Sequence, residues 1–146
     1  MSEKVNAPGK GLLKVSGIIG IIFAGIGCLV VGVTLMTIDA VISGMNMMGA
    51  GISSGTLTAY YVFALFLSIF GVYVYLMGIL NCDKLEKASS LKTLGIIYIV
   101  ITVIGAIVAV NLLGFSAIAF TAVELILPIL YIVGASRNIS SLEGNQ

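Results

Sequence analysis

Glu124 is the residue of this chain best placed to do chemistry, because it is the single acidic side chain within four long apolar stretches. It lies nine positions after Phe115, where the fourth stretch begins, which in a helix is ~14 Å along the axis and close to the middle of a bilayer. An ionised carboxylate at that depth costs about 2.5–3.5 kcal/mol, and no Lys or Arg at a similar depth can neutralise it, since Lys14 lies at the very start of the first stretch. We therefore expect Glu124 to rest in its protonated form.

Pro128 adds a second polar group at the same depth. Proline has no amide hydrogen, so the carbonyl oxygen four residues earlier, which belongs to Glu124, loses its helical hydrogen bond. Spacings of three and four residues place a set of four side chains on one helical face: Thr121, Glu124, Pro128 and Tyr131. We expect this face to point into a helix bundle and to meet a hydroxyl group of another span: Ser68, Tyr75, Tyr98 or Thr102.

Two interpretations of the carboxyl group stay open. The functional one is a proton or cation site in a transporter or channel component. The structural one is a neutral acid that hydrogen-bonds a neighbouring helix and fixes helix pairing, a contact worth about 0.6–2 kcal/mol in a membrane. The apolar stretches offer no second carboxylate and no basic partner at a similar depth, which favours the structural interpretation.

The first apolar stretch carries a small residue at every fourth position: Ser16, Gly20, Ala24, Cys28 and Gly32. Small side chains let two membrane helices approach closely, so this stripe predicts a helix-packing seam. The seam is equally compatible with packing inside one chain and with contact between subunits. If it is internal, Gly105 and Ala109 of the third stretch are the first partners to test.

No enzyme chemistry is legible in the chain. It contains no His, the commonest proton-transfer side chain, and it has neither a phosphate-binding loop nor a dinucleotide fingerprint. Cys28 and Cys82 have neither the spacing of metal ligands nor membrane depths that would allow a disulfide. A net charge of +1 without a basic patch argues against a nucleic-acid partner. We therefore expect a protein that is not an enzyme, binds no nucleic acid and needs no metal or cofactor.

The elements that position these residues follow from the composition. Hydrophobic residues make up 60% of the chain and charged residues 9%, which is too little polar material to cover a water-facing globule. The apolar runs lack the alternation of a membrane β-barrel and are long enough to cross ~30 Å of hydrocarbon as helices. The predicted spans are residues 12–36, 57–80, 94–113 and 115–135 of one domain, with short flexible termini at 1–11 and 138–146. We predict an all-α integral membrane bundle of four transmembrane helices, with the lipid bilayer as its surroundings.

The basic residues fall in segments that share one side of the membrane if each span crosses it once. They precede the first span, lie between the second and third, or follow the fourth: Lys4, Lys10, Lys14, Lys84, Lys87, Lys92 and Arg137. Short basic segments stay in the cytoplasm, so both termini are expected there. We expect an integral protein of a prokaryotic cell membrane.

A weak internal repeat suggests two related helical hairpins. The segment KVSGIIGI from Lys14 resembles KTLGIIYI from Lys92, and YLMG from Tyr75 resembles YIVG from Tyr131. Both hairpins begin on the same side, so an axis along the membrane normal would relate them. Apolar sequences also match by chance, and duplication stays a hypothesis.

The sequence locates this protein more sharply than it defines its function. We expect a small accessory or scaffold subunit that acts through helix contacts, as a homo-oligomer or within a larger membrane complex. The alternative is a proton- or cation-coupled transporter or channel component that uses Glu124.

Overall fold

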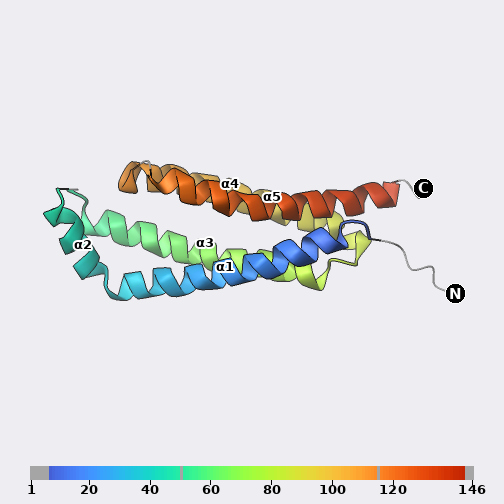
Figure 1. The fold of residues 1–146 in the computed structure, drawn as a ribbon, viewed down its shortest axis with the longest axis horizontal. Helices are drawn as coiled ribbons and strands as arrows, with labels where there is room; N and C mark the ends of the chain where they lie inside the picture. The colour runs from blue at the N-terminus through green and yellow to red at the C-terminus, as the bar shows by residue number, and fades with distance from the viewer. Residues whose placement is uncertain (1–6, 50, 115, 144–146) are drawn as a thin grey trace.

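Four helices of 26 to 28 residues make up most of the protein in a computed structural model, which describes residues 7–49, 51–114 and 116–143 (Figure 1). They are α1 (Lys10–Met36), α3 (Ser54–Leu80), α4 (Ala88–Leu113) and α5 (Ser116–Glu143). The short helix α2 (Ile38–Met47) joins α1 to α3, and the 3-10 helix η1 (Leu85–Lys87) precedes α4. Four helical segments are long and apolar enough to cross a membrane, which confirms the predicted fold class.

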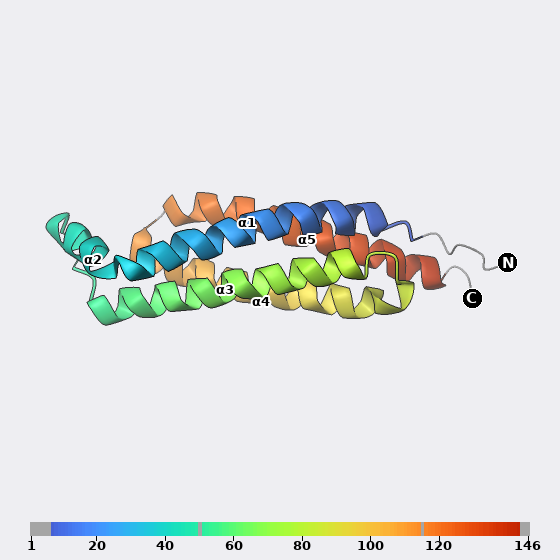
Figure 2. The same cartoon turned by 90° about the horizontal axis from the view of Figure 1, so that it is seen from below.

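The four long helices form a ring in the order α1, α3, α4, α5. α1 packs most extensively against α3, and α4 against α5, so the bundle consists of two antiparallel hairpins (Figures 1 and 2). Contacts of α1 with α5 and of α3 with α4 join the hairpins. The hairpins lie closest together at the end that carries both termini and diverge toward α2 (Figure 1).

Positive charge gathers at the end of the bundle formed by the start of α1, by η1 and by the end of α5, which we call the basic end. The basic residues of the described part of the chain all belong to it: Lys10, Lys14, Lys84, Lys87, Lys92 and Arg137. Lys10 Nζ lies 3.7 Å from Asp83 Oδ2, and this ion pair joins the start of α1 to the connection that follows α3. The opposite end, which carries α2, is called the α2 end.

The outward faces of the helices are apolar. Leu29, Val33 and Ile107 are examples of large side chains that stay exposed on these faces. So large an apolar surface suits lipid, because lipid accepts it while water does not.

Tyrosine rings fill the core toward the basic end. The ring of Tyr75 packs edge-on against those of Tyr98 and Tyr131, with centroids 5.7 and 6.1 Å apart. Glycines make room for these rings: a methyl group on Gly20 would lie 2.5 Å from the ring of Tyr75, and one on Gly78 would overlap the ring of Tyr131. The close approach of the helices therefore depends on the absence of side chains at these positions.

The two hairpins share a matching contact that corresponds to the sequence repeat. A methyl group on Gly17 would lie 3.1 Å from the carbonyl oxygen of Tyr75, and one on Gly95 would lie 3.0 Å from the ring of Tyr131. In each hairpin, the glycine of the first helix thus meets the tyrosine segment of the second.

The end of α5 differs from the sequence prediction. Residues 138–143 were expected to be unstructured, but α5 continues through Glu143 and the side chain of Asn138 is fully buried. Asn138 packs against the other helix ends at the basic end, whereas Ser140 and Glu143 of the same segment are exposed. The first three predicted spans lie within α1, α3 and α4, whereas residue 115, where the fourth begins, lies outside the described residues.

Candidate functional site

Glu124 lies between two hollows of the bundle. All four long helices line the first, a central cavity of 180 Å³ whose polar side chains are Tyr60, Ser68, Thr102, Thr121 and Glu124. The second is a groove of 620 Å³ between α1 and α5, called here the α1–α5 groove. Ser68 and Glu124 line both, so the cavity and the groove adjoin at these two side chains.

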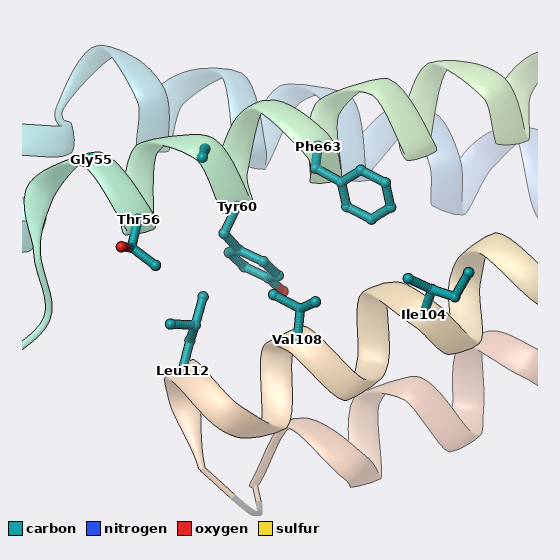
Figure 3. A pocket seen from close by; sticks show the side chains of 8 residues that line it. Gly55, Thr56, Tyr60, Phe63, Ile104, Val108 and Leu112 are labelled. Carbon is teal, nitrogen blue, oxygen red and sulfur yellow. The ribbon is translucent and has the colours of Figure 1, made fainter.

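A third hollow, of 570 Å³, opens between α3 and α4 where the hairpins diverge (Figure 3). Tyr60 projects from α3 into this space toward Val108 of α4, as Figure 3 shows. Tyr60 and Phe63 line the central cavity as well, so this hollow and the central cavity follow one another in the part of the bundle toward α2. The α1–α5 groove adjoins the cavity nearer the middle of the long helices.

Thr102 brings an unsatisfied hydroxyl group to the central cavity. Its side chain is 2% exposed, and its oxygen makes no hydrogen bond with any residue that the structure describes. The hydroxyl group of Tyr98, one turn earlier on α4, lies near it without hydrogen-bond geometry. Buried polar groups are normally paired, so an unpaired one that faces a cavity marks a place where a ligand or water would bind.

Ser68 is the counterpart of Glu124 in the first hairpin. Ser68 precedes Tyr75 by seven residues, and Glu124 precedes Tyr131 by the same interval. Ser68 Oγ donates a hydrogen bond to the Ala64 carbonyl oxygen at 2.9 Å, which leaves its lone pairs available to a ligand. The two hairpins therefore present a hydroxyl and a carboxyl group to the same hollows.

The predicted polar face of α5 has two parts. Pro128 and Tyr131 are buried, while Glu124 is exposed where the α1–α5 groove opens and Thr121 is half-buried beside the central cavity. The hydroxyl groups expected to meet Glu124 do line its hollows: Ser68 and Thr102 the cavity, and Ser68, Tyr75 and Tyr98 the groove.

Tyr131 serves a structural purpose instead. Its hydroxyl group donates a hydrogen bond to the Val74 carbonyl oxygen at 3.1 Å. Tyr131 and Asn138, both on α5, form side-chain hydrogen bonds to other parts of the bundle: Tyr131 to α3, and Asn138 to the start of α1 and to the connection after α3.

The small-residue stripe packs inside the chain where it nears the basic end. Ser16, Gly20 and Ala24 are buried, and Gly20 lies directly against Tyr75 of α3. Cys28 and Gly32 are half-buried, and a methyl group on Gly32 would contact nothing within 4 Å. The seam is thus internal over its first three positions.

The expected partner of the seam was wrong. Gly105 of α4 faces Phe63 and Leu67 of α3, not α1. The order of helices around the ring explains this, because it places α4 diagonally opposite α1 and leaves α3 and α5 as its neighbours.

Asn138 is the residue that sequence reasoning missed. The amide of Gly9 donates to Asn138 Oδ1 at 2.7 Å, and Asn138 Nδ2 donates to the Cys82 carbonyl oxygen at 3.2 Å. One side chain thereby ties α5 to the start of α1 and to the end of the first hairpin. Its spacing of seven residues from Tyr131 was a usable signal, since it continues the inward face of the helix.

The fold and the hollows define a four-helix membrane-type protein with a carboxyl group beside two hollows of the bundle. The chain matches no family model, no curated protein and no solved structure. Glu124 and the two hollows beside it are therefore the features of the molecule that bear on its activity.

Proposed function

We propose that the protein is a transporter or channel component in which Glu124 binds and releases a proton or a cation. The observation that carries the proposal is the place of Glu124 between the central cavity and the α1–α5 groove, neither of which is lined by a Lys or Arg of the part of the chain that the structure describes. An acid that served only helix pairing would be expected to sit hydrogen-bonded within a closed interface. Hollows beside the carboxyl group offer an ion both a site and a route.

Access is proposed from the α2 end. The central cavity and the hollow between α3 and α4 lie toward that end, whereas the tyrosine cluster and Asn138 close the bundle toward the basic end. The basic end is proposed to face the cytoplasm of a prokaryotic cell, because short basic segments are retained there. Glu124 would then exchange its proton or cation with the outer side in this conformation.

A role as an accessory subunit is the second candidate, and α2 is the observation that favours it. The helix has no buried residue, and Met47 and Met48 are 86% and 83% exposed. This surface suits contact with a partner subunit or a second copy better than the stripe of α1 does, because the first three positions of the stripe are buried inside the chain. Replacing Met47 and Met48 by Ser should then lower the mass of the native complex in nanodiscs, while an unchanged mass would count against this role.

The transport proposal is tested by flux in proteoliposomes. Glu124→Gln keeps the size of the side chain and removes its charge, so it should lower proton or cation flux by at least about tenfold, toward the level of protein-free liposomes. Glu86→Gln, in η1 at the basic end, is the matched control and should keep wild-type flux. Wild-type protein that moves H⁺, Na⁺ and K⁺ no faster than empty liposomes, or a Glu124→Gln variant as active as wild type, would refute the proposal.

A further inference from the structure

We infer that the cation bound by Glu124 is an amphiphilic organic cation, such as a long-chain alkylammonium, which enters from the lipid through the α1–α5 groove. This inference rests on the proposed function and adds the chemical class of the ligand. It follows from the shape of the groove, from the character of its walls and from its charge.

The groove opens sideways, toward lipid. Its rim consists of exposed apolar side chains: Ile19 and Phe23 on α1, and Val123 and Ile126 on α5. Phe23 and Val123 are 60% and 61% exposed, so nothing within the described chain covers the opening. A molecule dissolved in the bilayer could reach the groove without crossing water.

Small residues of α1 create the hollow and tyrosines of α3 and α4 form its inner wall. Gly20, Ala24 and Gly27 line it from α1, and the buried rings of Tyr75 and Tyr98 close it toward the core. Its 620 Å³ lies within the range of about 300–1,000 Å³ typical of sites for small organic molecules. The walls can therefore bury an alkyl chain or a small apolar body.

Charge selects the ligand. Among the described residues, Glu124 is the only carboxyl or amino side chain that lines the groove. A cation can take the place of its proton, whereas an anion would be repelled by the ionised carboxylate and a neutral chain would leave that carboxylate unpaired. A hard inorganic cation requires about six oxygen ligands to replace its water, and the mostly apolar groove offers few. An organic cation needs no such shell, so a mostly apolar groove with one carboxyl group can hold it.

The test measures binding of radiolabelled decyltrimethylammonium to the protein in nanodiscs, with empty nanodiscs as background. Wild-type protein should show saturable binding that decyl sulfate and decanol do not displace. Glu124→Gln should weaken the affinity by about tenfold, which corresponds to about 1.4 kcal/mol. Ala24→Leu, which fills the groove, should weaken it as well, while Gly25→Leu, at the adjacent position where a methyl group would contact nothing within 4 Å, should leave it unchanged.

The outcomes separate this inference from the proposed function. Displacement by decanol as strong as by the unlabelled cation would show a lipid-filled groove without charge selection and would overturn the inference. Absence of saturable binding together with Glu124-dependent proton or sodium flux would overturn it too, yet leave the proposed function intact. Absence of both would remove both proposals. If Ala24→Leu does not fold, Ile126→Trp on the exposed rim tests the same volume, since it narrows the opening without touching the core.

Discussion

Replacing Asn138 by Ala should destabilise the bundle by about 2 kcal/mol. The side chain is 0% exposed and bonds the Gly9 amide at 2.7 Å and the Cys82 carbonyl oxygen at 3.2 Å, so its loss leaves one donor and one acceptor unpaired. Each unpaired buried group costs about 1–3 kcal/mol, whereas hydrogen bonds between membrane helices average about 0.6 kcal/mol. Because the basic end is close to the water interface, we take about 1 kcal/mol for each bond, which together lowers the folding equilibrium constant by about 30-fold.

Unfolding of the purified protein in mixed micelles, driven by added dodecyl sulfate and followed by far-ultraviolet circular dichroism, measures this change. Asn111→Ala is the matched control, because Asn111 is exposed and bonds only the Ile107 carbonyl oxygen of its own helix at 2.7 Å. The control should stay within about 0.5 kcal/mol of wild type. An Asn138→Ala variant no less stable than the control would refute the view that this side chain holds the basic end together.

Two further predictions concern packing and topology. Gly78→Ala should cost about 1–3 kcal/mol in the same unfolding assay, because the new methyl group would overlap the ring of Tyr131. Gly25→Ala is the control and should be neutral or slightly stabilising, because a methyl group there has open space around it. Equal losses of stability at both sites would contradict the packing described. Lys14→Cys and Lys87→Cys, each in a chain without its native cysteines, should react with a membrane-impermeant maleimide from the same side of the membrane. A cysteine placed in α2 should react from the opposite side. Labelling of the two lysine positions from opposite sides would exclude the proposed topology.

Sequence alone was sufficient for the four long helices, apart from the last turns of α5, and for the gathering of positive charge. Both depend on local features: the length of the apolar runs decides which segments form helices in lipid, and the order of spans decides at which end each basic residue lies. The inward direction of Pro128 and Tyr131 was likewise predictable, because helical spacing places them on one face.

Only the tertiary structure decided which faces meet and where space remains. The stripe of α1 could have faced any neighbour, and the ring order places Gly20 against Tyr75 of α3. The central cavity lies where the two hairpins diverge toward α2, and the α1–α5 groove lies over small residues of α1. Both hollows depend on how four helices are arranged, which no single apolar run encodes. Asn138 was predicted to belong to a polar tail because hydropathy is a property of a local segment. Its burial depends instead on Gly9 and Cys82, which are distant in sequence and become adjacent to it only after folding.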